Sequence, residues 1–224
     1  MIVLLIVIAL AIFVLPNLWA QWVLKRHARG RHDYPGTGAE LASHLLRRFE
    51  LQGVKVERSE QGDHYDPLDR AVRLSPAHFD GRSLTAVTVA AHEVGHALQH
   101  AQGYAPLIAR SRMIGVAQKA EKLGALLMMA APFLFILTRL PGGLAAVIAI
   151  AVISFGTAAL VHLVTLPVEF DASFNRALPL LKEYVPPHDM KSARHVLTAC
   201  AFTYVAASLA SILNLGRWLV ILRR

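Results

Sequence analysis

The sequence predicts an α-helical integral membrane protein with about four transmembrane helices and one small α+β domain. The first reason is composition: of 224 residues, 55% are hydrophobic and 17% are charged, whereas a soluble globular chain carries about 25% charged residues. The second is that the mean hydropathy is +0.45 and that the apolar residues are gathered into long runs. These features exclude a disordered chain, a collagen, a small disulfide scaffold and an ordinary cytosolic enzyme.

The first apolar run, residues 1–24, predicts an anchor that is not cleaved. A secretory signal peptide carries its basic residues in front of the apolar region. Here no basic residue precedes the run, and Lys25 and Arg26 follow it directly.

Three further runs complete the predicted domain organisation. The run at 123–138 is short for a span, the run at 142–166 is long enough to cross a bilayer with tilt, and the last begins near residue 196. The expected order is an anchor at 1–24, a folded domain at 25–112, two spans at 113–166, a helix and loop at 167–195, and a span with a basic tail at 196–224.

Basic residues predict the orientation of the chain. They are concentrated in residues 25–31, 110–122 and 176–194, so the positive-inside rule places 25–112 and 167–195 in the cytoplasm. Loop charge of this kind also explains the net charge of +8. No basic patch with interleaved aromatic residues is present, so we expect the lipid bilayer, and not nucleic acid, as a partner.

Local signals in segment 25–112 predict two helices and a hairpin. Thr37 and Glu40 form a capping-box pattern that opens a helix closed by Gly53. The alternating stretches 54–58 and 71–75 suggest two strands of a long hairpin. Ser83 then caps a helix that runs to about residue 102, where Gly103 supplies a left-handed stop.

That last helix contains the sequence His92-Glu93-Val94-Gly95-His96. Residues four apart lie on one helix face, so His92 and His96 can direct two imidazoles at one metal ion. Glu93 projects about 100° further round the axis, where it can act as a general base toward a water molecule without ligating the metal. Chance produces this pattern only about 0.02 times in a chain of this composition. We therefore predict one catalytic Zn²⁺.

A third ligand must come from another segment on the same side of the membrane. Four carboxylates after the third apolar run qualify: Glu169, Asp171, Glu183 and Asp189. Glu169 is favoured because it follows the run directly, behind Pro167. His100 lies about 12 Å along the helix from His92, too far to share one ion.

The chain resembles the YugP-type neutral zinc metallopeptidases of prokaryotic membranes. The resemblance rests on the segments 91–100 (AHEVGHALQH) and 166–173 (LPVEFDAS), with 64–67 (HYDP) and 74–76 (LSP). It implies a zincin-like domain in which His92, His96 and Glu169 bind zinc and Glu93 is the catalytic base, in a protein of the prokaryotic inner membrane.

The chain also resembles the wider gluzincins, some of which carry a helical Glu-x-x-x-Asp motif. Here the residue four after Glu169 is Ser173, and the acid stands at Asp171. Either could orient a zinc-binding histidine: Ser173 has the right helical phase and Asp171 is the stronger acceptor. Candidates for a donor to the oxyanion are Arg176, His64, Tyr65 and Tyr184.

The function predicted from these residues is hydrolysis of peptide bonds by a membrane-anchored zinc metalloendopeptidase, with membrane proteins or their juxtamembrane segments as substrates. Two alternatives stay open: a zinc-binding membrane scaffold without catalysis, and a metal-handling transporter that uses His162 within the third apolar run. The sequence leaves a homo-oligomer open.

Overall fold

The computed structural model describes residues 2–31, 33–138, 149–150, 153, 161 and 165–203. The chain divides into two compact units. The first, here called the main unit, joins Pro16–Ile108 with Leu166–Thr203; the second joins Met1–Leu15, Ala109–Thr165 and Tyr204–Arg224. The residues singled out from the sequence for the zinc site and its chemistry lie in the main unit, whereas His162 falls in the second.

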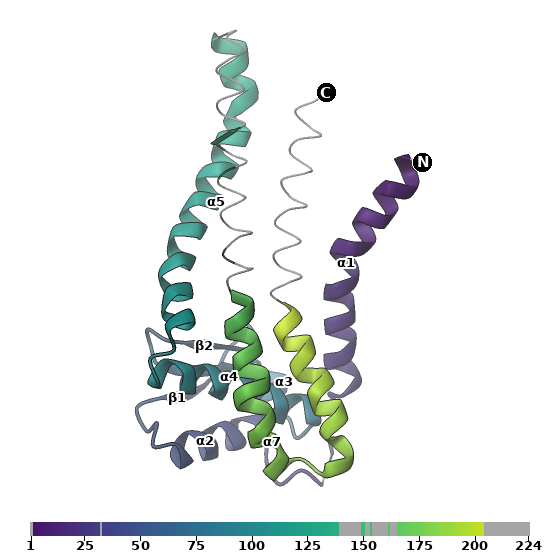
Figure 1. Ribbon diagram of the computed structural model, residues 1–224, viewed down its shortest axis with the longest axis vertical. Coiled ribbons are helices and arrows are strands. Elements are labelled where there is room, and N and C mark those ends of the chain that lie inside the picture. The colour runs from purple at the N-terminus through teal and green to yellow at the C-terminus, as the bar shows by residue number, and fades with distance from the viewer. Residues whose placement is uncertain are drawn as a thin grey trace. The chain divides into compact units, whose positions relative to one another are not determined.

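Helices make up most of the described structure (Figure 1). Two helical segments, residues 165–170 and 190–203, flank the last labelled elements. The labelled helices are α1 (Ile2–Arg26), α2 (Gly38–Arg48), α3 (Pro76–Phe79), α4 (Leu84–Ala101), α5 (Ala105–Thr138), the π-helix η1 (Asp171–Ala177), α7 (Leu178–Tyr184) and the short 3-10 helix η2 (Pro187–Asp189).

Three short strands form one sheet in the order β1-β3-β2. Strand β1 (Lys55–Arg58) pairs parallel with β3 (Ala71–Leu74), and β2 (His64–Asp66) pairs antiparallel with β3. The predicted hairpin between 54–58 and 71–75 is therefore wrong. The polar stretch between the two predicted strands contains β2. This strand pairs antiparallel with one edge of β3, and β1 pairs parallel with the other edge.

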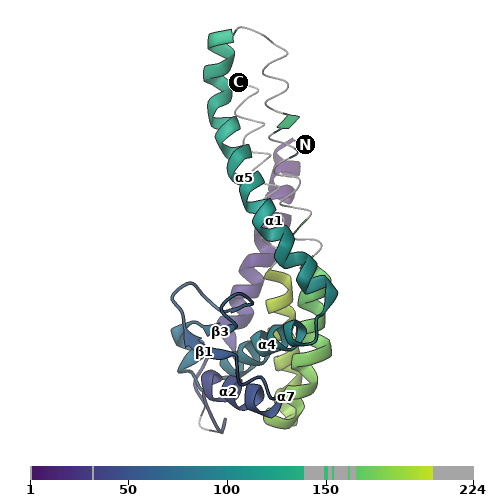
Figure 2. The ribbon, with the colours of Figure 1, turned by 90° about the vertical axis from the view of Figure 1, so that its left-hand side faces the viewer.

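Helix α4 is the centre of the main unit. It contacts α2, α3, η1, α7 and the strands β2 and β3, and Figure 2 shows it between the sheet and α2 on one side and the segment containing α7 on the other. Every residue from Leu84 to Gln99 is buried as a result. Because α4 is enclosed by its neighbours, the histidines and the glutamine on its buried face are held by hydrogen bonds within the protein.

The helix caps predicted from the sequence are confirmed in all but one case. Thr37 and Glu40 form the full capping box, and the Ser83 hydroxyl accepts a hydrogen bond from the Ala86 amide at 3.1 Å. Gly103 adopts a φ of 64°, as a left-handed stop requires. After α2, however, the left-handed residue is Glu50, with a φ of 58°, and not Gly53.

A partly buried polar cluster connects the loop before β2 to the start of α3. Asp63 Oδ1 accepts hydrogen bonds from the amide and hydroxyl of Ser75, and Asp63 Oδ2 lies 2.8 Å from His78 Nδ1. Burial raises the pKa of Asp63, but the interactions with His78 and Ser75 outweigh this and lower it below its usual range. Both Ser75 and Asp63 approach the same ring nitrogen of His78. The cluster therefore connects two segments of the fold. It does not have the geometry of a catalytic triad, in which both ring nitrogens of the histidine are used.

The prediction of about four transmembrane helices is wrong. Among the described residues, no helix combines the length with the apolar character needed to cross a bilayer. In α5, charged residues continue as far as Lys122, so its apolar part is confined to 123–138, while a span needs about 20 residues. Most of the predicted span at 142–166, with His162, and the second half of the one at 196–213 lie outside the described residues.

Candidate metal centre

Three side chains from two separate segments meet at one point of the main unit. His92 and His96 project from the same face of α4, with ring centroids 4.7 Å apart and ring planes at 80°. Glu169, from the helical segment 165–170, places Oε2 3.2 Å from His92 Nε2 and 3.3 Å from His96 Nε2. One ligand atom from each residue lies within 4.8 Å of the other two. One metal ion can therefore be reached by all three.

The donor set fits zinc. Two imidazole nitrogens and one carboxylate oxygen are the protein ligands of many catalytic zinc sites, in which a fourth position stays open. Glu169 is fully buried. Burial raises the pKa of its carboxyl group, but the neighbouring imidazoles of His96 and His92 lower it to well below the usual range. Glu169 is thus a carboxylate at neutral pH, as a metal ligand must be.

The ring of His92 is oriented by Ser173. The Ser173 hydroxyl lies 3.0 Å from His92 Nδ1 and donates its own hydrogen to the carbonyl of Leu197 at 3.3 Å. Because that hydrogen is used, the hydroxyl accepts from His92, so Nδ1 carries a proton and Nε2 is the ring nitrogen left to bind a metal. Of the two residues considered for this role, Ser173 is thus the one that contacts His92.

The ring of His96 is oriented by a residue that sequence reasoning missed. His96 Nδ1 lies 2.9 Å from Gln99 Oε1, and the Gln99 amide group donates to the carbonyl of Val168 and to Asp171 Oδ2, both at 2.8 Å. Asp171 therefore acts on the histidine through Gln99. The sequence signal that could have indicated this role is the position of Gln99, a polar residue three positions after His96 on the same helix.

A π-helix follows the third candidate ligand. Element η1 begins at Asp171, two residues after Glu169, and π-helical turns are frequent at functional sites. The wider turn brings residues five apart together, so Arg176 Nε donates to Asp171 Oδ2 at 2.6 Å. Arg176 Nη1 also donates to Gln102 at 2.7 Å. Arg176 is thus engaged in holding η1 against α4.

The other sequence candidates are not brought to the metal centre. His64 and Tyr65 lie on β2, and Tyr65 Oη makes a 2.7 Å hydrogen bond with His100 Nδ1. Of the alternative third ligands, Glu183 forms an ion pair with Arg48 at 2.7 Å, and Asp189 with Arg31 at 2.6 Å.

The predicted base, Glu93, is buried together with the candidate ligands. The exposed fractions are 3% for His92, 6% for Glu93, 5% for His96 and 0% for Glu169. The centre therefore lies largely within the protein interior.

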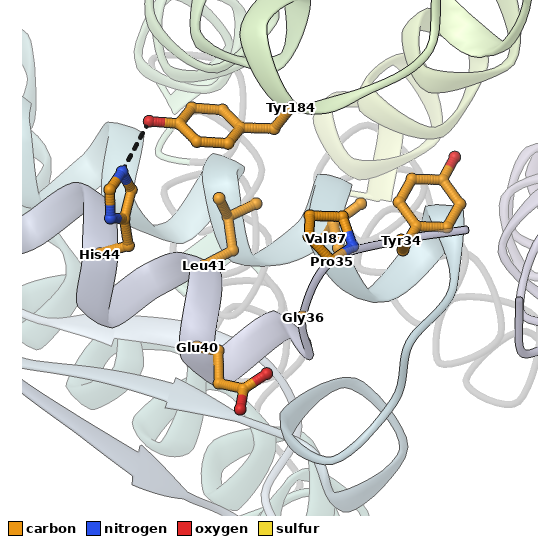
Figure 3. A pocket seen from close by; sticks show the side chains of 8 residues that line it. All are labelled: Tyr34, Pro35, Gly36, Glu40, Leu41, His44, Val87 and Tyr184. Carbon is orange, nitrogen blue, oxygen red and sulfur yellow. Dashed lines mark hydrogen bonds between the residues drawn. The ribbon is translucent and has the colours of Figure 1, made fainter. Parts of the chain in front are cut away.

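Two cavities of the main unit lie elsewhere. A cavity of about 320 Å³ is lined by α2 and its approach, together with Val87 and Tyr184. Figure 3 shows the Tyr184 hydroxyl directed at His44, to which it is hydrogen-bonded at 2.9 Å. A second cavity, of about 350 Å³, is bordered by Tyr65, Arg70 and His100. Neither is lined by a candidate ligand, so neither can be equated with the reaction site.

Comparison with known proteins identifies the family. The family model described as "Putative neutral zinc metallopeptidase" matches residues 2–223, nearly the whole chain. The chain belongs to this family. It is also 38% identical over 212 residues to a Bacillus subtilis (strain 168) protein named "Putative membrane protease YugP", covering 92% of this chain and 91% of the relative. No solved structure matches the chain.

Membership of this zinc peptidase family agrees with the resemblance drawn from the motifs at 91–100 and 166–173. It also agrees with the choice of zinc for the centre formed by His92, His96 and Glu169. The name of the relative associates that protein with a membrane.

Gly95 lies where α4, which carries the two histidines, packs against η1, which follows Glu169. We therefore expect Gly95→Ala to impair the metal centre. A Cβ at this position would lie 2.8 Å from the carbonyl oxygen of Ala172 in η1. The contact is with backbone, so η1 must shift and carry Glu169 and Ser173 with it. We expect zinc affinity to fall by about 10-fold or more, as it does when the outer partners of a metal site are disturbed.

The matched control for this change is Gly115→Ala in α5. Among the described residues, nothing lies within 4 Å of a Cβ added there. Alanine should be neutral at this position or stabilise the helix by about 0.5–1 kcal/mol. Zinc titration of both variants checks the expectation, and equal affinities in the two would show that the contact between Gly95 and η1 does not control the site.

Proposed function

We propose that this chain is a zinc-dependent endopeptidase in which His92, His96 and Glu169 bind the ion and Glu93 is the general base. The observation that carries the proposal is that buried His92 and His96 on α4 and buried Glu169 on the facing segment place one ligand atom each within 4.8 Å of one another, and that Glu93 lies on the same helix as the two histidines. Family membership supports it. When bound, zinc would lower the pKa of a water molecule and polarise the carbonyl of the substrate.

The chain's own residues would handle the proton. The Glu93 carboxylate, next in sequence to His92, accepts a proton from the attacking water and delivers it to the nitrogen of the leaving amine. Ser173 and Gln99 keep Nε2 of each imidazole directed at the ion by accepting the hydrogen on Nδ1. No covalent intermediate with the enzyme is needed.

A zinc-binding scaffold without catalysis is the less favoured alternative. Such a scaffold needs the three ligands but has no use for a carboxylate at position 93, and burying an ionisable group costs free energy. The transporter alternative relied on His162, which lies outside the described residues.

We further propose that the substrates are membrane proteins or their juxtamembrane segments, cleaved at the cytoplasmic face of a prokaryotic inner membrane. The name of the relative supports association with a membrane. So do Trp19 and Trp22 on α1, which are 39% and 54% exposed, and the guanidinium of Arg26, 5.0 Å from the Trp22 ring centroid. Exposed tryptophans beside basic residues are typical of a surface that meets lipid headgroups.

Removing and restoring the metal tests this function. The purified chain, stripped by a chelator and reloaded with one equivalent of Zn²⁺, is incubated with an unfolded membrane protein and with an unfolded soluble protein. Mass spectrometry then locates any cleavage. We expect cleavage only with zinc, and faster cleavage of the membrane protein.

Three results would contradict the proposal in whole or in part. Cleavage that survives removal of the metal would exclude a zinc mechanism. Tight binding of one zinc ion without cleavage of either protein would favour the scaffold. Equal rates for the two proteins would leave the peptidase intact but overturn the preference for membrane substrates.

A further inference from the structure

We propose that Gln99 is a positioning residue. Its amide holds the side chain of His96 and the backbone beside Glu169 at a fixed separation, and thereby sets the metal affinity of the centre. The inference rests on the proposed function only in taking these two residues as ligands. Gln99 is wholly buried, and its side chain makes three hydrogen bonds of 2.8–2.9 Å within the protein.

The partners of Gln99 leave its amide one orientation. The carbonyl of Val168 and the carboxylate of Asp171 can only accept hydrogen bonds, so both must face the NH₂ group of the amide. The oxygen Oε1 is then directed at His96 Nδ1, which must carry the ring hydrogen. With Nδ1 held in this hydrogen bond, Nε2, which lies 3.3 Å from Glu169, is the ring nitrogen available to a metal.

The same amide also holds the segment that carries the third ligand. Val168, whose carbonyl accepts from Gln99, directly precedes Glu169 in the chain. One side chain on α4 is therefore bonded both to a candidate ligand on its own helix and to the backbone beside a candidate ligand on the facing segment. A displacement of either segment stretches a hydrogen bond to Gln99.

Asp171 is itself fixed from the opposite side. It accepts from Asn175 at 3.0 Å and from Arg176 at 2.6 Å. Arg176 reaches back to Gln102 near the end of α4, at 2.7 Å, and its guanidinium lies 5.6 Å from the centroid of the Tyr104 ring. The hydrogen bonds thus form a closed circuit from α4 to η1 and back to α4, with Gln99 as the member that contacts a ligand.

The experiment compares zinc affinity, measured by competition with a chelating dye, in four variants of the full chain. These are Gln99→Ala, Gln99→Glu, the double variant Gln99→Glu with Asp171→Asn, and Gln52→Ala as a control at an exposed glutamine. The visible spectrum of the Co²⁺-loaded protein reports the geometry of the centre, and thermal unfolding without metal reports the fold.

We expect Gln99→Ala to weaken zinc binding by about 10–100-fold and to change the Co²⁺ spectrum, while Gln52→Ala changes neither. Gln99→Glu places two carboxylates in contact and should bind zinc as weakly. In the double variant, Glu at 99 accepts from His96 and from Asn at 171, with no change in net charge, although it still lacks a donor for the carbonyl of Val168. This variant should recover part of the affinity.

If Gln99→Ala does not fold, the comparison of the double variant with Gln99→Glu still tests the proposal. Wild-type affinity in Gln99→Ala, or a double variant no tighter than Gln99→Glu, would overturn the role of Gln99. None of these measurements requires proteolysis. If the wild type binds zinc but cleaves no protein, the peptidase function fails while the role of Gln99 in metal binding still stands.

Discussion

Replacing Glu93 with glutamine is expected to abolish peptide hydrolysis while zinc stays bound. Glutamine has nearly the same shape as glutamate, so it should fit the buried position, where only 6% of the residue is exposed. It cannot accept the proton of the attacking water, and removal of a general base costs about 10²–10⁴-fold in rate. The measurement is the rate of cleavage of an unfolded membrane protein at equal bound zinc.

The control for this prediction is Glu60→Gln, the same chemical change at an exposed residue, which should leave the rate unchanged. Equal cleavage by Glu93→Gln and the wild type would show that the activity comes from a contaminant or that another group is the base. Loss of both zinc and cleavage in Glu93→Gln would instead assign Glu93 to the binding of the metal.

The parts of the fold set by neighbouring residues could be predicted from the sequence. The capping box at Thr37 and Glu40, the Ser83 cap and the Gly103 stop each depend on contacts within a few residues. Strand pairing does not. Nothing local shows that β2, three residues within a polar stretch, takes the antiparallel side of β3 and leaves β1 parallel. The hairpin prediction failed for that reason.

The same distinction applies to the candidate site. The spacing of His92 and His96 places them on one helix face wherever that helix lies, and the structure adds Glu169 at hydrogen-bonding distance from both. The role of Gln99 depends on a carbonyl and a carboxylate from residues 168 and 171. No pattern within the sequence of α4 predicts those partners. Ser173 and Asp171, between which the sequence could not choose, each orient a different histidine, Asp171 through Gln99.

Hydropathy led to the one large error. A run of apolar residues signals burial from water, but it does not say whether lipid or protein covers them, and its length decides whether it can cross a bilayer. In α5 the run starts only after Lys122. Average composition could not reveal that limit, because it counts apolar residues wherever they lie.

Glu169→Gln is expected to remove zinc from the centre. Glutamine preserves the volume of the side chain, which matters because Glu169 is fully buried, but it removes the only negative charge among the three candidate ligands. Neutral amides are poor ligands for zinc, whose usual protein ligands are thiolates, imidazoles and carboxylates. We expect zinc affinity to fall by about 100-fold or more, beyond the usual effect of losing an outer partner, and cleavage to be lost with it. Chelator competition measures the first effect and the protease assay the second.

Glu183→Gln is the sharpest control because Glu183 was among the four carboxylates that the sequence offered as third ligand. In the structure it pairs with Arg48 at 2.7 Å, and its side chain is 54% exposed. Losing an exposed ion pair costs about 0–1 kcal/mol of stability, so zinc binding should not change. If Glu183→Gln loses zinc and Glu169→Gln keeps it, the assignment of the third ligand is wrong. If Glu169→Gln alone loses zinc, the convergence of two distant segments on one ion is the feature that makes this fold a metal site.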